Sequence, residues 1–202
     1  MSVYGFARAL VNAYSKIFFR TEYIGRENEP EDGNYIAFSN HTSFNDPIFT
    51  ACAVKKQISF IAKSTLAKNP FMNWLFRKCD VITINRGESD IHAMRVAVNA
   101  VEDGKVIAIY PQGTRQPDTE LVPSLAQPGI GLIAKKTKAP LLPVTICYGK
   151  KKPRLFRKVR VYIGKPILPS EYLSINESPN SREISEYCFG VICRTFKEKN
   201  HG

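Results

Sequence analysis

The sequence has few histidines, few cysteines and no long apolar run. Its 202 residues include three histidines and five cysteines, and no spacing among them matches a zinc site. An odd number of scattered cysteines without a secretion signal predicts reduced, buried thiols. No segment reaches the roughly 20 apolar residues that a transmembrane helix needs. We therefore exclude a zinc module, a disulfide scaffold and a protein with a spanning helix. The cysteines are Cys52, Cys79, Cys147, Cys188 and Cys193.

Acidic residues are also scarce relative to basic ones. Asp and Glu number 18 against 29 Lys and Arg, which gives a net charge of +11. The whole excess lies in residues 135–165, where eleven basic residues occur without any acid. Such an excess predicts an anionic partner, which could be nucleic acid, a membrane surface or an acidic protein. The hydrophobic fraction of 44% excludes a disordered chain and predicts a sizeable core.

Short apolar runs alternate with helical patterns along the chain. Runs of four to seven residues, rich in Ile and Val and bounded by turn residues, predict strands. The alternation predicts an α/β fold with a mixed, largely parallel sheet flanked by helices, as one domain over residues 21–202. The predicted strands are 35–39, 58–62, 81–84, 106–110, 141–147 and 159–163, and the clearest helices are 47–56, 72–79, 90–102, 129–138 and 183–197.

Residues 1–20 have the periodicity of an amphipathic helix. A helix of this kind, basic and with aromatic residues, can lie flat in a membrane interface. The alternative is a first helix whose apolar stripe packs on the domain core, and the periodicity alone does not separate the two. The apolar stripe comprises Phe6, Leu10, Ala13, Tyr14, Ile17 and Phe18, and the polar positions are Arg8, Asn12, Ser15 and Lys16.

Polar segments follow three of the predicted strands, at residues 40–46, 85–87 and 111–115. Ligands of open α/β sheets bind beyond the carboxyl ends of the strands, so the chemistry is expected there. His41 is suited to act as a general base at neutral pH, and Asp46 is the carboxylate near it in sequence. A carboxylate at the second ring nitrogen fixes the imidazole tautomer. The alternative is structural, with Asp46 as a helix N-cap before Pro47.

Two arginines follow strands in the other two segments. A guanidinium at a strand end, with a glycine that allows close backbone approach, suits a phosphate or a carboxylate. Arg86 and Arg115 have this position, with Gly113 next to the second. The alternative is that each arginine makes a structural salt bridge.

Four ordered blocks of residues resemble the glycerolipid acyltransferase family typified by 1-acyl-glycerol-3-phosphate acyltransferase. Residues 40–46 (NHTSFND) match its N-H-x-x-x-x-D block. Residues 81–87 (VITINRG) look like the second block, and 110–115 (YPQGTR) look like the third, which is usually F-P-E-G-T-R. Residues 139–144 (APLLPV) look like the fourth, and the resemblance covers about residues 30–165.

The resemblance implies transfer of a fatty acyl group from an acyl thioester, on coenzyme A or acyl-carrier protein, to a lysolipid hydroxyl. It makes His41 the base and Asp46 its partner, with backbone N–H groups near the first block holding the oxyanion. It implies no metal and no cofactor beyond the thioester co-substrate. Gln112 departs from the usual Glu, which leaves the acceptor head group open. The phosphate ligands it implies are Arg86, Gly113, Thr114 and Arg115, with Asn40 and Gln112 supporting the acceptor or the loop.

The expected product is phosphatidic acid, made from lysophosphatidic acid for phospholipid synthesis. A lysolipid resides in a bilayer, so we expect a peripheral or monotopic protein on the cytoplasmic face of the cell membrane. The basic residues of 135–165 would then face anionic head groups or acyl-carrier protein. Two alternatives stay open: another lysolipid acceptor, and a non-catalytic binder of anionic surfaces or nucleic acid that uses residues 135–165, although no nucleic-acid motif occurs there.

Overall fold

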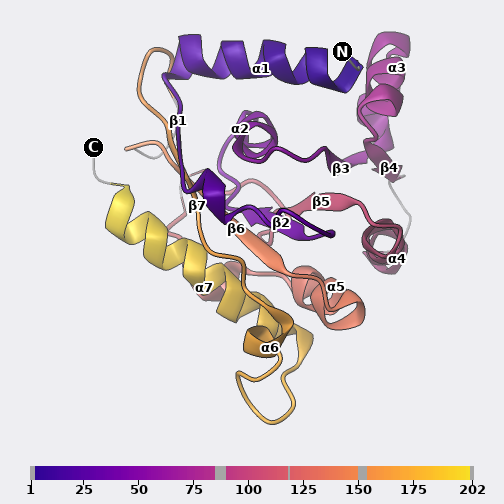
Figure 1. Cartoon of the computed structure of the whole chain (residues 1–202), viewed down its shortest axis with the longest axis vertical. Helices are drawn as coiled ribbons and strands as arrows, with labels where there is room; N and C mark the ends of the chain where they lie inside the picture. The colour runs from indigo at the N-terminus through magenta and orange to yellow at the C-terminus, as the bar shows by residue number, and fades with distance from the viewer. Residues whose placement is uncertain (1–2, 85–89, 118, 150–153, 201–202) are drawn as a thin grey trace.

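The computed structural model describes residues 3–84, 90–117, 119–149 and 154–200. Seven strands form a sheet in the order β1-β7-β6-β2-β5-β3-β4 (Figure 1). Only the β6–β7 pair is antiparallel among the paired strands described, so the mixed, largely parallel sheet is confirmed. The strands are β1 (Glu22–Ile24), β2 (Ile36–Ser39), β3 (Ile58–Lys63), β4 (Ile82–Ile84), β5 (Val106–Ile109), β6 (Leu141–Cys147) and β7 (Arg160–Ile163).

Strand β1 is absent from the sequence prediction. It has three residues and pairs in parallel with β7 at one edge of the sheet. Three residues are too few to display an alternating pattern, so only the pairing with β7 defines this strand. The six predicted strands are present, and their ends differ from the prediction by one residue at most.

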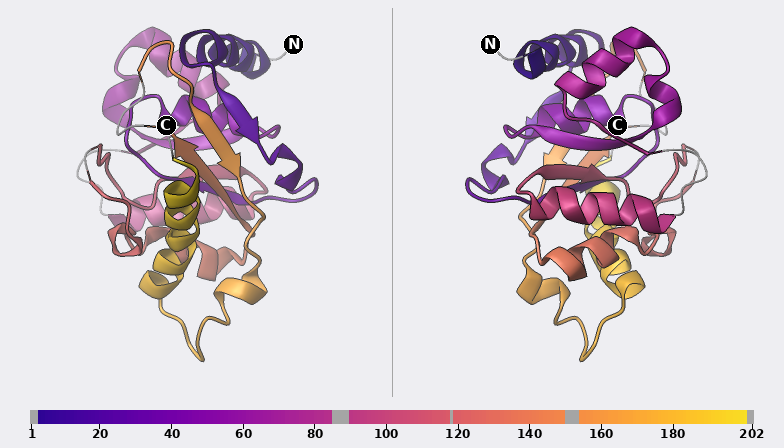
Figure 2. Two further views of the ribbon diagram at one scale, coloured as in Figure 1. Left: turned by 90° about the vertical axis from the view of Figure 1, so that its left-hand side faces the viewer. Right: turned by 90° about the vertical axis from the view of Figure 1, so that its right-hand side faces the viewer.

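Helices cover both faces of the sheet, which creates two buried hydrophobic clusters (Figure 2). One cluster lies between the sheet and α4, α5 and α7, and the other lies between the sheet and α2 with the end of α1. Two-sided burial explains why the central strands are continuous apolar runs. The helices are α1 (Val3–Phe19), α2 (Asp46–Ala53), α3 (Pro70–Lys78), α4 (Asp90–Glu102), α5 (Gly129–Thr137), α6 (Pro169–Tyr172) and α7 (Ser181–Lys199).

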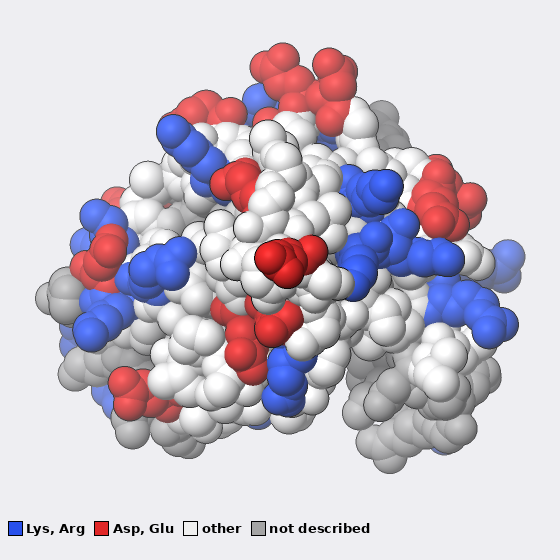
Figure 3. Space-filling view, turned by 90° about the horizontal axis from the view of Figure 1, so that it is seen from below, with Lys and Arg blue, Asp and Glu red and all other residues white. Residues whose placement is uncertain are grey.

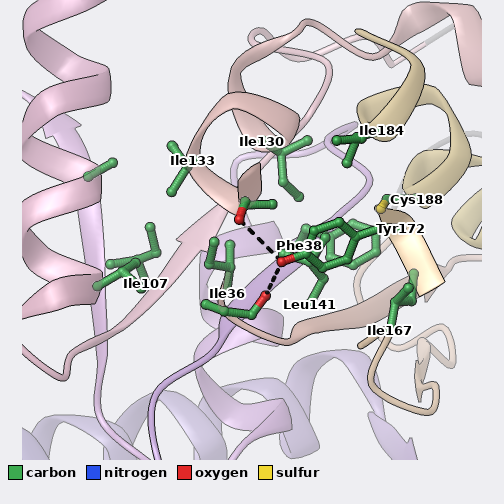
Figure 4. Close-up of a cluster of buried hydrophobic side chains, with 14 of the residues drawn as sticks. Ile36, Phe38, Ile107, Ile130, Ile133, Leu141, Ile167, Tyr172, Ile184 and Cys188 are labelled. Carbon is green, nitrogen blue, oxygen red and sulfur yellow. Dashed lines mark hydrogen bonds between the residues drawn. The ribbon is translucent and has the colours of Figure 1, made fainter. Parts of the chain in front are cut away.

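A buried tyrosine fixes α5 within the first cluster. The Tyr172 hydroxyl donates to the carbonyl oxygens of Ala134 and Ala139, at 3.2 and 3.1 Å (Figure 4). These carbonyls belong to the end of α5 and the connection that follows it. Because Ile130 and Ile133 of α5 line a cavity beside the predicted base, this packing also positions one wall of the candidate site.

Helix α1 presents most of its apolar stripe to the outside. Phe6, Leu10 and Ile17 are 57%, 56% and 62% exposed, and they are spaced so that they share one side of the helix. Among the apolar residues of the helix, Phe19 at its end is the one buried in the core. The interpretation in which the apolar stripe packs on the core is therefore wrong for these positions.

The polar side of α1 faces the protein instead. Arg8 donates hydrogen bonds to the carbonyl oxygens of Val54 and Lys55, at the end of α2. Ser15 is fully buried, with its hydroxyl 3.1 Å from that of Thr21. Arg8 and Ser15 are thus bonded to the domain, whereas the buried Asn12 Oδ1 has no hydrogen-bond partner among the described residues. Phe6, Leu10 and Ile17 stay exposed on the other side of the helix.

The basic stretch 135–165 does not form one patch. Lys135 and Lys136 belong to α5, on the opposite side of the sheet from α1. Arg157 follows Phe156, whose N–H donates to the Phe18 carbonyl of α1 at 2.5 Å. The face opposite α1 carries both basic and acidic side chains (Figure 3). The charge run is therefore divided between separate surfaces of the molecule.

Candidate active site

The predicted site begins where β2 ends, between β5 and β6. Asn40 is fully buried directly after the strand. Its Nδ2 donates to the Ile146 carbonyl at 3.0 Å, and its Oδ1 accepts from the Ile146 N–H at 2.9 Å. These two bonds continue the pairing of β2 with β6 through a side chain. Asn40 therefore fixes the start of the loop that carries the predicted base.

His41 and Asp46 are in direct contact, as the spacing predicts. His41 Nδ1 lies 2.8 Å from Asp46 Oδ2, and the two side chains are 18% and 0% exposed. A carboxylate only accepts hydrogen bonds, so Nδ1 carries the proton of this contact. The second nitrogen, Nε2, is then the basic atom of the neutral ring.

Asp46 belongs to the first turn of α2 and its carboxylate turns back toward the loop. Besides His41, Oδ2 accepts from the N–H groups of Thr42 and Ser43 at 2.7 and 2.8 Å. Asn45 is the residue that precedes the helix, and Asp46 is the first helical residue. The structural alternative, with Asp46 as the N-cap, is therefore wrong. A carboxylate in this position is also stabilised by the positive end of the helix.

Two tyrosines complete the surroundings of the pair, and the sequence prediction misses both. The Tyr110 ring stacks on His41, with centroids 4.2 Å apart. The Tyr148 hydroxyl donates to Asp46 Oδ1. Burial, followed by the charge of Asp46, holds the pKa of each tyrosine well above its usual value, so both remain protonated donors. Tyr110 begins the third block, whereas Tyr148 lies 102 residues from Asp46 in the chain and carries no local signal.

Gln112 contacts the loop from the other side. Its Oε1 accepts from the His41 backbone N–H at 2.6 Å, and the side chain is 2% exposed. The N–H donor identifies the facing amide atom as oxygen. The buried Nε2 has no hydrogen-bond partner among the described residues. Gln112 thus holds the backbone at His41 and still has donor capacity.

Arg115 and the residues before it reach the surface beside the loop. Gly113 has a φ of +70°, which an L side chain adopts only with strain. Thr114 and Arg115 are exposed. The Arg115 guanidinium lies 3.2 Å from the centre of the Phe44 ring, and Phe44 is 77% exposed. Arg86, the other predicted phosphate ligand, lies outside the described residues.

The N–H groups at the start of the first block are already bonded. His41 N donates to Gln112, and the N–H groups of Thr42 and Ser43 donate to Asp46. In this arrangement they hold the loop and the aspartate, so they do not fit the expected role in an oxyanion site. This expectation is corrected for these three groups.

His41 lines an apolar cavity of about 300 Å³ between β5, α4 and α5. A larger cavity of about 760 Å³ shares Met94, Gly113, Gln127 and Gly129 with it and extends between α4 and α5. The two spaces together run from the loop that holds His41 along the side of the domain. Their size and apolar lining are typical of a site for an extended apolar ligand.

The cysteines take no part in this site. Burial raises the pKa of Cys147 and Cys188 to about 12 and that of Cys193 to about 11.

Within the described residues, no three His, Cys, Asp or Glu side chains come together as a metal site. In the same part of the chain, no helix is long and apolar enough to cross a bilayer.

Known proteins with similar sequences carry acyltransferase names. A family model described as Acyltransferase matches residues 20–147. A chloroplastic 1-acyl-sn-glycerol-3-phosphate acyltransferase of Brassica napus is 31% identical over 76% of this chain and 47% of its own length. A 1-acyl-sn-glycerol-3-phosphate acyltransferase of Streptococcus pneumoniae is 29% identical over 73% of the chain and 55% of its length. The chain thus spans about half the length of these curated relatives.

A solved structure extends the comparison over nearly the whole chain. The crystal structure of the 1-acyl-sn-glycerophosphate acyltransferase PlsC from Thermotoga maritima superposes with a TM-score of 0.78 and 28% identity. The match covers 97% of this chain and 79% of that one. The family model spans more than half of the sequence, including both members of the His41–Asp46 pair. The chain therefore belongs to the acyltransferase family.

Proposed function

We propose that this protein transfers a fatty acyl group from an acyl thioester to the free hydroxyl of 1-acyl-glycerol-3-phosphate. The observation that carries the proposal is the 2.8 Å contact between His41 Nδ1 and the buried Asp46 carboxylate. It leaves Nε2 as the base beside a cavity that His41 itself lines. Relatives and a solved structure carry the name of this activity.

The proposed reaction is a direct transfer. His41 Nε2 takes the hydroxyl proton while the acceptor oxygen attacks the thioester carbonyl carbon. The C–O bond forms, and the resulting tetrahedral intermediate collapses with cleavage of the C–S bond. The departing thiolate takes the proton from the imidazolium. Asp46 stabilises that imidazolium without accepting the proton, which is its role in related His–Asp pairs.

Three of the proposed phosphate ligands, Gly113, Thr114 and Arg115, are exposed residues that follow β5. Arg115 is exposed beside the loop that holds His41, with its guanidinium over Phe44. A guanidinium binds phosphate through paired N–H groups, and the positive φ of Gly113 turns the backbone there. Thr114 adds a hydroxyl, and Arg86 completes the proposed set. The donor, on either coenzyme A or acyl-carrier protein, would extend its acyl chain into the apolar cavities between α4 and α5.

We also propose that α1 attaches the protein to the membrane that holds its lysolipid. The support is the outward-facing stripe of Phe6, Leu10 and Ile17 on a helix whose polar side is bonded to the domain. An amphipathic helix of this kind lies in the interface without crossing it. Deletion of residues 1–20 is expected to release the protein from anionic vesicles.

The reaction is tested by His41→Ala. We expect acyl transfer to lysophosphatidic acid to fall at least about 10³-fold, because the base is lost. His92→Ala is the matched control, since His92 is an exposed histidine on α4. Full activity of folded His41→Ala would refute the mechanism.

The head-group role is tested by Arg115→Ala. Loss of a charge-assisted contact of about 1.5–3 kcal/mol should raise the acceptor KM by about 10- to 100-fold. The KM for the acyl donor should stay unchanged. Arg182→Ala removes an exposed arginine of α7 and serves as the control. Equal increases in both KM values would argue against phosphate binding by Arg115.

A second acceptor is favoured by one specific observation. Gln112 replaces the usual Glu of the third block, and a relative named lyso-ornithine lipid O-acyltransferase from Rhodobacter capsulatus is 29% identical over 86 residues. An assay with lysophosphatidic acid, other lysophospholipids and lyso-ornithine lipid decides between them. A preference for the uncharged or zwitterionic acceptors would overturn the choice of lysophosphatidic acid.

A further inference from the structure

We infer that α3 and the turn at residues 154–157 form, together with α1, one docking face for an anionic lipid bilayer. Membrane attachment through α1 is part of the proposed function, and the present inference rests on it. The new part of the face consists of α3 and the turn, which follow α1 in the chain after about 50 and about 135 residues. Each of them exposes large apolar side chains and lies next to α1.

Helix α3 has an unusual surface for a helix of a globular domain. None of its residues is buried, although Phe71 and Trp74 are large apolar side chains with exposures of 64% and 48%. The two rings stack with centroids 6.0 Å apart. Leu66, in the short helix before α3, is 58% exposed. Aromatic residues of this kind, followed by Arg77 and Lys78 at the helix end, are typical of a membrane interface.

The turn between β6 and β7 reaches the other end of α1. Leu155 and Phe156 are both 58% exposed. The Phe156 N–H donates to the Phe18 carbonyl at 2.5 Å, and the two rings lie 6.0 Å apart. Figure 1 shows this connection rising to the C-terminal end of α1. The turn is thus attached to the helix that carries the first part of the face.

Helices α1 and α3 are also neighbours. Tyr4, Ala7 and Val11 of α1 line an apolar cavity of about 210 Å³ together with Leu75 of α3 and Cys79 after it. Figures 1 and 2 show both helices at the same end of the molecule. The exposed side chains of α1, α3 and the turn therefore belong to one end of the protein.

The net positive charge of the three segments favours an anionic bilayer as the partner that binds this surface. Residues 3–20, 64–79 and 154–157 contain no Asp or Glu. They carry basic residues instead, which draw a protein to anionic lipids, whereas the opposite face shows both signs (Figure 3). Large exposed aromatic and aliphatic groups favour insertion into lipid over a contact with a polar, acidic protein. The basic residues of the three segments are Arg8, Lys16, Arg20, Lys68, Arg77, Lys78, Arg154 and Arg157.

Trp74 offers a direct test, because it is the single tryptophan of the chain. The full-length protein is mixed with vesicles of phosphatidylcholine alone, or with added phosphatidylglycerol, with and without brominated acyl chains. We expect Trp74 emission to shift to shorter wavelength on anionic vesicles and to fall about twofold with bromine present. High salt should reverse both effects by weakening the attraction.

Variants test the contribution of each added segment. Phe71→Ser in α3 and Leu155→Ser in the turn should each weaken vesicle binding about tenfold in co-sedimentation. Leu168→Ser is the control, because Leu168 is 48% exposed and lies before α6 at the opposite end of the molecule. Near-UV circular dichroism verifies that the variants are folded. Equal binding of all three variants would overturn the inference.

The outcomes separate this inference from the proposed reaction. Vesicle binding with Trp74 still fully accessible to acrylamide overturns the docking face and leaves acyl transfer standing. Insertion of Trp74 without any acyl transfer to micellar lysolipid supports the face and refutes the reaction. A Trp74 response to acyl-carrier protein, with none to vesicles, would assign the surface to a protein partner and overturn the lipid assignment.

Discussion

The variant Tyr148→Phe tests how much the hydrogen bond from Tyr148 to Asp46 contributes to stability and to the reaction rate. Asp46 Oδ2 is bonded to His41 and two backbone N–H groups, whereas Oδ1 accepts from Tyr148. In Tyr148→Phe, a buried carboxylate oxygen loses its donor. The loss of a hydrogen bond to a charged group costs about 1.5–3 kcal/mol, and we expect the free energy of unfolding to fall by about 2 kcal/mol.

Tyr148→Phe should lower kcat/KM less than a substitution that removes the charge of Asp46. The three bonds to Oδ2 remain in Tyr148→Phe and preserve the contact with His41. We expect kcat/KM to fall about tenfold, or about 1.4 kcal/mol, compared with about 10⁴-fold when the aspartate of a His–Asp pair is made neutral. The raised pKa of Tyr148 keeps it protonated, so the ratio of the two enzymes should be constant from pH 6 to 9.

Tyr35→Phe is the matched control. It removes a buried hydroxyl that donates to the Glu29 carboxylate at 2.7 Å, before β2 and at the opposite end of that strand from His41. Urea denaturation should show a loss of stability in both variants, and the kinetics of acyl transfer should change only in Tyr148→Phe. An identical kcat/KM for Tyr148→Phe and the wild type, with both fully folded, would refute a positioning role for Tyr148.

Three further predictions follow from the same region and from the core. Gln112→Ala should lower the free energy of unfolding by about 1 kcal/mol in urea, because the His41 N–H loses its acceptor; Gln57→Ala, at an exposed position, should not. Asn40→Ala should lower the free energy of unfolding by about 2 kcal/mol in urea, since two buried bonds are lost; an unchanged midpoint would contradict this. Cys79 should react with a disulfide reagent at pH 8 before Cys188, whose pKa burial raises to about 12; the reverse order would contradict the described burial.

The sequence predicted the elements that long apolar periodicity defines. Residues 90–102 and 141–147 have the same bounds in the structure as in the prediction, because each is long and is buried by several neighbours. The His41–Asp46 contact was also predictable, since its five-residue separation lies within one loop. Contacts between residues that lie close together in the chain can therefore be predicted from their spacing alone.

Features that depend on distant partners were not predictable. Periodicity located the apolar stripe of α1 but gave no information on which side of the helix meets the domain. The side of α1 that faces the domain is set by hydrogen bonds from Arg8 to the carbonyls of Val54 and Lys55, more than 45 residues away in the chain. The hydrogen bond from Tyr148 to Asp46 joins two residues that are 102 positions apart in the chain. In each case the decisive contact is set by the strand order, which no local pattern contains.

Helix α2 connects the proposed membrane face to the chemistry. Its first residue is Asp46, and the carbonyl of Val54 at its other end accepts from Arg8 of α1. A cation at this end of a helix satisfies free carbonyls and opposes the negative end of the helix dipole. Eight residues of α-helix span about 12 Å, so a rigid element of this length separates α1 from Asp46. Under the proposed function, this short helix sets the height of His41 relative to the bilayer that holds the proposed lysolipid acceptor.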